Sequence, residues 1–404
     1  MIEALRHPTV QKFIHDHENE DEKTLLLKHK EIHGVPAARI AEQITGRRKA
    51  KTKLPLYYNT PGILYPAGLG MEQCSSEKTA DFKAALLKDQ ISNKTCCADL
   101  TGGFGIDALF ISRIVDMVHF VEPNEALLQL ARHNHQLLKA ENIVYHNTTA
   151  EAFLKDSPDR FDAVFIDPDR RDKHSKKMFR LNECEPDITT LAGLVFEKSD
   201  ILLLKASPWL DIQQGVHDLP FVKKVVILAL DNECKESLYL CVKNYHEEAT
   251  IETVNLTSNS DQRFLFLLSA EKESVVQYSE PLRYLYDPNA AIRKAGGFKT
   301  LAAEYNLLKI HPNTHLYTSD TLIQPFPGRV FSIEAFVKPR HSALKEFLPD
   351  LKANVITRNY PLQPDELKKK LSLKDGGDKF LIAFTGEKNR KHLAFATAVQ
   401  PNFT

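Results

Sequence analysis

Short apolar runs alternate with amphipathic stretches between residues 95 and about 270. The runs have the length and composition of buried strands: "TCCADL", "MVHFVE", "NIVYHN", "DAVFID", "DILLLKA", "KKVVILAL", "LYLCV" and "RFLFLLS". Helical stretches such as "IDALFISRI" and "EALLQLARHNHQLLKAEN" separate the first of these runs. This order predicts an α/β fold with a doubly wound parallel sheet, which binds ligands at the carboxyl ends of its strands.

The segments on either side of this region have other patterns. Residues 1–58 predict an N-terminal helical segment that contains the basic run "GRRKAKTK". Residues 276–328 predict a small helical or ferredoxin-like insert, and residues 329–404 alternate as βαβαββ, the order of a C-terminal ferredoxin-like α+β domain. The sequence therefore predicts four parts, of which residues 59–275 form the α/β domain.

Composition limits the class of protein only broadly. With 404 residues, of which 43% are hydrophobic and 26% charged, the chain can form two or three domains with their own cores. Basic and acidic residues are equal at 53 each, so any affinity for nucleic acid has to come from local patches. The N-terminus lacks an apolar signal segment and no apolar run is long enough for a membrane span. We therefore expect a cytoplasmic protein that does not enter a membrane.

The cysteines favour a reducing compartment. The six cysteines show no C-x-x-C spacing, and Cys96 and Cys97 are adjacent inside an apolar run. This pattern is typical of buried, reduced thiols and not of metal ligands, so we expect no metal site.

A glycine-rich segment, "ADLTGGFGID" (98–107), connects a predicted strand to a predicted helix. Without a Cβ, Gly102, Gly103 and Gly105 let the backbone approach a ligand while the helix offers free N–H groups. The spacing G-G-x-G, preceded by Asp99, differs from the G-x-G-x-x-G of dinucleotide enzymes. The loop therefore predicts a nucleotide-type site, with a tight structural turn as the alternative.

An acidic residue follows the next predicted strand. Glu122, in "HFVEPNEALL", stands where a carboxylate can accept both ribose hydroxyls of an adenosine. Such an acid does not distinguish NAD from S-adenosylmethionine. The alternative explanation is an exposed acid at the start of the helix that begins at Asn124.

A polar cluster ends the fourth strand, in "FDAVFIDPDRRDK". It consists of Asp167, Pro168, Asp169, Arg170 and Arg171. A dehydrogenase has no use for such a cluster, whereas a group-transfer enzyme needs polar groups beside its acceptor. The alternative is a salt-bridged loop at the end of a strand.

On these residues the sequence resembles the class I S-adenosylmethionine-dependent methyltransferases. "DLTGGFGID" is similar to their first motif, "VEPN" to their acidic second-strand motif, and "DPDRR" to a variant of the D-P-P-Y motif of enzymes that methylate amino nitrogens of nucleobases. Together with "MEQCSSEKTA", "KASPWLD" and "RNYP", the arrangement resembles a bacterial methyltransferase family with a THUMP-like C-terminal domain. The resemblance implies a Rossmann-like methyltransferase sheet. It also implies an RNA substrate, since THUMP domains belong to RNA-modifying enzymes.

The resemblance also assigns residues to S-adenosyl-L-methionine. Asp99 and the glycine loop would hold the methionine part, Glu122 the ribose, and the residues after the third strand the adenine. The residues assigned in this way are Asp99, Thr101, Gly102, Gly103, Gly105, Glu122, Pro123, Asn124, Thr149 and Ala150. The family often has Asp at the position of Thr149.

The acceptor side is assigned to the cluster after the fourth strand. Methyl transfer from a sulfonium is an in-line displacement, so the acceptor lone pair must come to about 3 Å from the methyl group. The resemblance implies catalytic roles for Asp167, Pro168, Asp169 and Arg170, with the Asp167 carboxylate and the Pro168 carbonyl accepting two amino hydrogens. Arg170 replaces the aromatic residue of the motif and can stack on a base or bind phosphate.

Other basic and aromatic residues have two possible roles each. The basic run at residues 47–53 can contact phosphates or form a solvated helix end. Lys205 and Trp209 follow the fifth strand and can shape the acceptor pocket, although core packing is the favoured role for Trp209, the only tryptophan. The residues that could extend a nucleic-acid surface in the C-terminal part are Arg358, Lys388, Arg390 and Lys391.

The sequence thus predicts a methyltransferase that uses S-adenosyl-L-methionine and modifies an amino nitrogen of an RNA base. One alternative is a methyltransferase of a protein or a small metabolite. Another is a nucleic-acid-binding module whose methyltransferase fold is inactive, and the presence of Asp99, Glu122 and Asp167 argues against that one.

Overall fold

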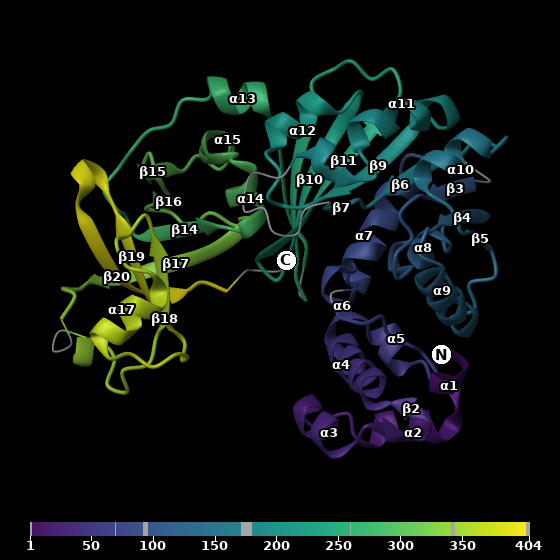
Figure 1. Cartoon of the computed structure of the whole chain (residues 1–404). Coiled ribbons are helices and arrows are strands. Elements are labelled where there is room, and N and C mark those ends of the chain that lie inside the picture. Colours follow the sequence, from purple (N-terminus) through teal and green to yellow (C-terminus); the bar gives the residue numbers. More distant parts are fainter. Residues whose placement is uncertain are drawn as a thin grey trace. The chain divides into compact units, whose positions relative to one another are not determined.

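The computed structural model describes residues 2–68, 70–91, 96–170, 180–258, 260–340 and 344–400. The chain forms two compact units. Unit 1 comprises residues 1–223 and 238–247, and unit 2 comprises residues 224–237 and 248–404. Figure 1 labels the elements of both units.

The N-terminal segment is helical, as predicted. Its helices lead into α7, and Ser76 caps α7 by a capping box with Thr79. The elements of this segment are α1 (Ile2–Arg6), α2 (Pro8–Asp16), α3 (Glu22–Lys28), β1 (Glu31–Ile32), β2 (Val35–Pro36), α4 (Ala37–Lys53), α5 (Pro55–Asn59), α6 (Gly70–Gln73) and α7 (Glu77–Lys88).

A parallel sheet forms the centre of unit 1. Five strands lie in the order β9-β6-β3-β4-β5, and each neighbouring pair is parallel. These strands are β3 (Cys96–Asp99), β4 (Met117–Val121), β5 (Ile143–His146), β6 (Ala163–Ile166) and β9 (Ile201–Ala206). Their connections run through α8 (Ile106–Ile111), α9 (Glu125–Leu137), α10 (Ala150–Asp156) and α11 (Ile188–Lys198). The predicted α/β fold is confirmed.

Burial explains why these strands could be predicted from the sequence. Every residue of β6 and of β9 is buried, and the last three residues of β3 are buried as well. A strand that is covered on both faces reads as a continuous apolar run. The exceptions are polar residues at strand ends, and these form the site described below.

Four more strands extend the sheet to nine in the order β13-β12-β10-β11-β9-β6-β3-β4-β5. They are β10 (Val222–Leu230), β11 (Glu233–Val242), β12 (Thr250–Leu256) and β13 (Gln262–Leu267), and α12 (Ile212–Asp218) precedes them. The sequence did not predict β12, because polar residues interrupt its apolar positions. The structure buries these polar side chains with partners. Glu252 pairs with Lys224 at 2.9 Å, and the Asn255 side chain accepts a hydrogen bond from the Asn232 N–H.

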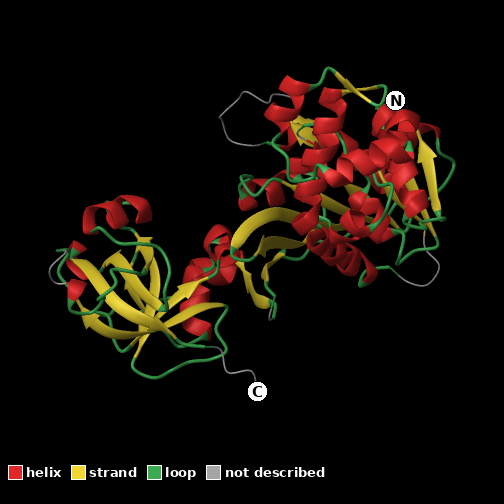
Figure 2. Cartoon of the chain, turned by 90° about the horizontal axis from the view of Figure 1, so that it is seen from below, coloured by secondary structure: helices red, strands yellow, loops and turns green. Residues whose placement is uncertain are grey.

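Residues 284–398 form a second, seven-stranded sheet in the order β15-β16-β14-β17-β20-β19-β18, the strand-rich body of Figure 2. The insert contributes three strands besides two helices, and β14 pairs with β17 along five residues. Residues 329–398 therefore share this sheet with the insert and do not form one of their own. The elements are α13 (Leu268–Glu273), β14 (Tyr284–Pro288), α14 (Ala290–Ala295), α15 (Phe298–Glu304), β15 (Leu308–His311), β16 (Thr314–Ser319), β17 (Gly328–Phe336), β18 (Asn354–Arg358), α17 (Pro364–Leu371), β19 (Lys379–Thr385) and β20 (Lys391–Ala398).

The second sheet curls so that β14 and β16 approach β18 and β19, which lie at the other end of the strand order. The Thr314 hydroxyl, at the start of β16, donates a 2.6 Å hydrogen bond to the carbonyl of Thr385, at the end of β19. The Arg358 side chain, at the end of β18, reaches Asp287 on β14. Side chains from distant strands therefore meet at one place in unit 2.

In unit 1 the N-terminal helices share one hydrophobic core with the glycine loop. Buried residues of α2, α4 and α5 pack in the same cluster as Phe104, Ile106 and Phe110. The backbone of Leu64 exchanges hydrogen bonds of 3.0 and 2.8 Å with the side chain of Asn134 on α9. The segment before α7 is therefore fixed against the α/β part of unit 1, beside the cavity described next.

Candidate functional site

A cavity of about 380 Å³ lies at the carboxyl ends of β3, β4 and β6 in unit 1. It brings together most of the residues that the sequence predicted for the site. Those lining it are Asp99, Thr101, Gly102, Gly103, Gly105, Glu122, Pro123, Asn124, Thr149, Ala150, Asp167 and Asp169. Its volume is in the range of small-molecule sites.

The glycine loop has the shape that its glycines allow. A Cβ on Gly102 would lie 2.3 Å from the ring of Phe120, and one on Gly105 would lie 2.6 Å from Nε2 of His135. Gly103 and Gly105 also have φ values of +55° and +85°, a region that side chains disfavour. The loop is therefore pressed between β4 and α9, and its backbone forms one wall of the cavity.

Glu122 fixes the loop from the neighbouring strand. Its Oε2 accepts the Gly103 N–H at 2.9 Å and its Oε1 accepts the Asn124 N–H at 2.8 Å. Burial raises the pKa of this carboxyl, while the two backbone hydrogen bonds oppose the rise. Each carboxylate oxygen has two lone pairs, so both can still accept a hydroxyl from a ligand.

Asp99 ends β3 at the floor of the cavity and is only 1% exposed. Its Oδ1 accepts the N–H of Thr101 at 3.1 Å. Burial raises the pKa of Asp99 well above its usual value, and the nearby Asp107 carboxylate adds to this rise. A cation bound in the cavity would stabilise the charged form of Asp99.

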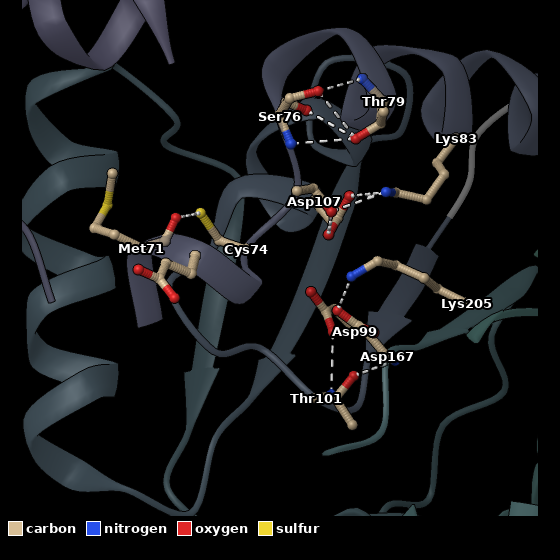
Figure 3. Close-up of polar contacts among 12 residues, drawn as sticks. Met71, Cys74, Ser76, Thr79, Lys83, Asp99, Thr101, Asp107, Asp167 and Lys205 are labelled. Carbon is tan, nitrogen blue, oxygen red and sulfur yellow. Dashed lines mark hydrogen bonds and ion pairs between the residues drawn. The ribbon is translucent and has the colours of Figure 1, made fainter. Parts of the chain in front are cut away.

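Asp167 directly follows β6 and is held by one residue of the glycine loop and one of the neighbouring strand β9. Its N–H donates to the Thr101 hydroxyl at 2.6 Å, and its Oδ2 pairs with the Lys205 ammonium from β9 (Figure 3). Burial raises the pKa of Asp167, whereas Lys205 lowers it. Oδ1 has no hydrogen-bond partner among the described residues, and the carboxylate keeps 31% of its surface exposed.

The rest of the "DPDRR" cluster is spread over different surroundings. Pro168 is buried, and Asp169 is exposed and lines the cavity. Asp169 and Arg170 form the short strand β7 (Asp169–Arg170), which pairs with β8 (Cys184–Glu185). Arg171 lies outside the described residues. The sequence did not predict that β7 and β8 pair, or that Glu185 on β8 lines the cavity.

The predicted adenine side is formed by the start of α10. Thr149 caps this helix, since its hydroxyl accepts the N–H of Ala152 at 3.3 Å. Thr149 and Ala150, which follow β5, both line the cavity together with Glu122 and Pro123 from the end of β4. The hydroxyl of Thr149 is engaged in the cap.

A buried lysine beside the cavity was missed by the sequence analysis. Lys83, on α7, has no exposed side-chain surface; its ammonium donates to the Ser75 hydroxyl at 2.8 Å and pairs with Asp107 at 3.1 Å. Ser75 in turn donates to Asp107 at 2.7 Å, and both residues line the cavity. Figure 3 shows Lys83 pointing to Asp107. The signal in the sequence was the segment "EQCSS" directly before a capped helix.

The cavity and its surroundings are acidic. Asp99, Asp107, Glu122 and Asp167 lie in its wall, while Lys83 and Lys205 are the ammonium groups paired with them. Among the described residues no group of three His, Cys, Asp or Glu could hold a metal ion. The excess of carboxylates favours a ligand that carries positive charge.

The structure changes the predictions for Trp209 and for the basic run at residues 47–53. Trp209 is 80% exposed on the loop after β9, so core packing is the wrong explanation for it. A solitary tryptophan among apolar residues reads as a core residue, whereas here the loop directs it to solvent. In the basic run, Arg47, Arg48 and Lys49 each pair with a glutamate, so their charges are largely neutralised.

Comparison with known families divides the chain into matched regions. Residues 82–212 match the family described as "Conserved hypothetical protein 95", residues 284–327 a ferredoxin-like domain, and residues 328–398 a family described as THUMP domain-like. The first region contains the cavity residues from Asp99 to Pro186, whereas the lining residues between Pro66 and Ser75 precede it. The comparison with curated proteins finds no match.

A solved structure resembles the chain over nearly its whole length. It is that of a protein from Porphyromonas gingivalis W83 assigned to the methyltransferases; it is 29% identical, covers 96% of this chain and 97% of its own, and has a TM-score of 0.83. The chain is thus similar to that protein over nearly its whole length, and its residues 328–398 match a THUMP domain-like family. The predicted combination of a methyltransferase domain and a THUMP-like domain is thereby confirmed.

More distant structures match a part of this chain. A methyltransferase from Streptococcus mutans in complex with SAH is 12% identical and covers 40% of this chain and 97% of its own, with a TM-score of 0.31. The methyltransferase yhhF from Escherichia coli is 19% identical and covers 42% of this chain and 85% of its own, with a TM-score of 0.30. Within the described residues, no helix combines the length and apolar character required to cross a bilayer.

Proposed function

We propose that this methyltransferase transfers a methyl group from S-adenosylmethionine to an amino nitrogen of an RNA base. The observation that carries the proposal is the single cavity in which the glycine loop, Glu122 and Asp167 converge from three neighbouring strands. The THUMP-like match at residues 328–398 supports RNA as the acceptor class.

The residues of the cavity fit S-adenosylmethionine. This cofactor carries a sulfonium and an ammonium, which suit a wall with seven carboxylates, two of which pair with buried lysines. Asp99 and the backbone of Gly102 and Gly103 would hold the methionine part, and Glu122 the ribose hydroxyls. When bound, the cofactor supplies an electrophilic methyl group.

The acceptor side follows from the surroundings of Asp167. Lys205 occupies Oδ2 and opposes the burial-induced rise in the pKa of Asp167, so it helps to keep the carboxylate charged. Oδ1 would accept an N–H from the acceptor's amino group, orient the nitrogen lone pair, and take the proton that leaves the nitrogen. The Thr101 hydroxyl fixes the backbone at Asp167 and so couples the acceptor side to the glycine loop.

Replacing Glu122 by Ala should weaken S-adenosylmethionine binding. The change removes a charged acceptor of two hydroxyls and the two contacts that shape the loop, and each hydrogen bond to a charged group contributes about 1.5–3 kcal/mol. Isothermal titration calorimetry measures the loss. Glu125→Ala is the matched control, since Glu125 is an exposed acid three residues further on and does not line the cavity. Equal affinities in the two variants would show that the ribose is held elsewhere.

The exposed position of Trp209 supports an acceptor with an aromatic ring, such as a nucleobase. Trp209 lies four residues after Lys205 on the loop that follows β9. Stacking of a base on an aromatic ring contributes about 1–3 kcal/mol, so Trp209→Ala should raise the KM for RNA by about 5- to 100-fold while kcat changes little. Trp209→Phe should retain most of the affinity. Steady-state kinetics with labelled cofactor and fractionated cell RNA test this, and an unchanged KM in the Ala variant would remove Trp209 from the acceptor site.

A further inference from the structure

Three arginines converge on one buried carboxylate in unit 2. Asp287, on β14, is 1% exposed. Arg358 donates to it through Nε and Nη2, both at 2.8 Å, and Arg329 donates through Nη2 at 2.7 Å. Arg293 lies 3.6 Å from Oδ1 of the same carboxylate. We call these four residues the Asp287 cluster.

The charges of the Asp287 cluster do not cancel. Three guanidinium groups face one carboxylate, and among the described residues Asp287 is the acid that pairs with each of them. Burial lowers the pKa of Arg293, Asp287 opposes this shift, and repulsion from Arg358 and Arg329 adds to it. Each guanidinium carries about five N–H donors, far more than one carboxylate can accept. The cluster therefore has two positive charges and many donors left for an external acceptor.

The excess positive charge of the Asp287 cluster faces the solvent. Asp287 lies beneath, while the side chains of Arg293, Arg329 and Arg358 keep 26%, 42% and 21% of their surface exposed. Arg329 stands directly opposite Asp287 across the β14–β17 pair, and Arg358 comes from the end of β18. The buried acid thus fixes three guanidinium groups in one place, which reduces the entropy lost when they bind a ligand.

The neighbourhood of the cluster adds positive potential and a buried ring nitrogen that has no hydrogen-bond partner among the described residues. Burial lowers the pKa of Lys309 to about 8. His315 has a pKa of about 4 because of burial and of the charges on Lys309, Arg293 and Arg358. Nδ1 of His315 is buried and has no hydrogen-bond partner among the described residues. An anion at the cluster would offset the repulsion between these groups.

The position of the cluster connects the two matched C-terminal regions. Asp287 and Arg293 belong to the ferredoxin-like region, whereas Arg329 and Arg358 belong to the THUMP domain-like region. A purely structural brace between two regions needs one guanidinium per carboxylate. The contrast is the basic run of α4, where three cations each have a glutamate of their own.

We propose that the Asp287 cluster binds backbone phosphates of the RNA that this methyltransferase modifies. Planar guanidinium groups match the oxygen geometry of a phosphate. The two excess positive charges match two neighbouring phosphodiester groups, each of which carries one negative charge. The inference rests on the proposed function for the identity of the RNA. Binding at this site requires neither methyl transfer nor the cofactor.

Arg329 is the best position for a test. It is the most exposed of the three arginines and makes one hydrogen bond to Asp287, so its loss leaves the pair with Arg358 intact. Arg329→Gln in the full chain should weaken the binding of a fluorescein-labelled single-stranded oligoribonucleotide by about 5- to 10-fold. It should also reduce the slope of log K against log salt by about one unit. Fluorescence anisotropy over a salt series measures both quantities.

Two further variants define the interpretation. Arg329→Lys keeps the charge and should keep most of the salt slope. Arg263→Gln is the matched control, because Arg263 is an arginine of the same unit, 51% exposed, that pairs with Glu252 and Asp261. This control should bind RNA with wild-type affinity. Thermal unfolding of each variant shows whether the fold is retained.

Each result decides the proposal. Wild-type affinity and salt slope in a folded Arg329→Gln variant would overturn it. Displacement of the RNA by inorganic phosphate at micromolar concentration would assign the cluster to free phosphate and overturn the RNA assignment. If Arg329 is needed for RNA binding but no RNA is methylated, the proposed acceptor is wrong and the cluster stands. If RNA is methylated and the Arg329 variants bind normally, the cluster is a brace.

Discussion

Asp167→Asn is expected to reduce kcat by about 100- to 1,000-fold, with cofactor affinity nearly unchanged, because the variant removes the charge that faces the reacting nitrogen. The raised pKa of Asp167 adds a pH signature. The carboxylate must be ionised, so turnover should fall as the pH drops through the raised pKa, at a higher pH than for an ordinary aspartate. Single-turnover rates with labelled cofactor, measured over a pH series, give both quantities.

The controls separate this role from loop structure. Asp162→Asn changes an acid at the opposite end of the same strand, where it accepts the Cys96 N–H, and should leave the pH profile unchanged. Lys205→Met removes the ion pair that lowers the pKa of Asp167, so the acid limb of the profile should move to higher pH. A wild-type rate in Asp167→Asn would show that the cluster after β6 is a structural loop.

Lys83→Met is expected to have the largest effect on stability. The Lys83 ammonium is fully buried and pairs with Asp107, whose side chain is only 11% exposed. Removing one member of a buried ion pair costs about 3–5 kcal/mol, because the other charge stays buried without compensation. The first thermal or urea transition of the full chain should therefore occur at a clearly lower temperature or concentration.

The matched control for this prediction lies on the same helix. Lys78 is exposed on α7, and Lys78→Met should change the free energy of unfolding by less than about 0.5 kcal/mol. A double variant, Lys83→Met with Asp107→Leu, should recover part of the loss, since it leaves no unpaired charge. Equal stabilities of the Lys83 and Lys78 single variants would mean that the ion pair does not stabilise unit 1.

The sequence predicted those parts of the site that follow buried strands. Asp99, Glu122 and Asp167 each come at the end of an apolar run, and parallel strands bring such residues to one edge of the sheet. The period of a helix does not reveal a buried lysine, and Lys83 was not among the residues that the sequence predicted for the site. Its role depends on Asp107, on a different helix, and only the packing of α7 against α8 brings the two together.

The Asp287 cluster shows a second limit of sequence reasoning. Its arginines stand at positions 293, 329 and 358, on a helix and two strands that are far apart along the chain. The local charge density at Arg358 is low, and it gave no reason to connect this residue with Asp287. The curl of the second sheet creates the cluster, and a strand order with such a curl does not follow from local patterns.

The pairing of β14 with β17 also determines where recombination or truncation can divide this chain without disrupting a sheet. The boundary between the two matched C-terminal regions, at residues 327 and 328, falls inside one hydrogen-bonded sheet. Recombination or truncation at that point would leave two strand edges with open main-chain groups, which invite self-association. We therefore expect the ferredoxin-like and THUMP-like regions to be inherited together and to need expression together, although family comparison matches them separately.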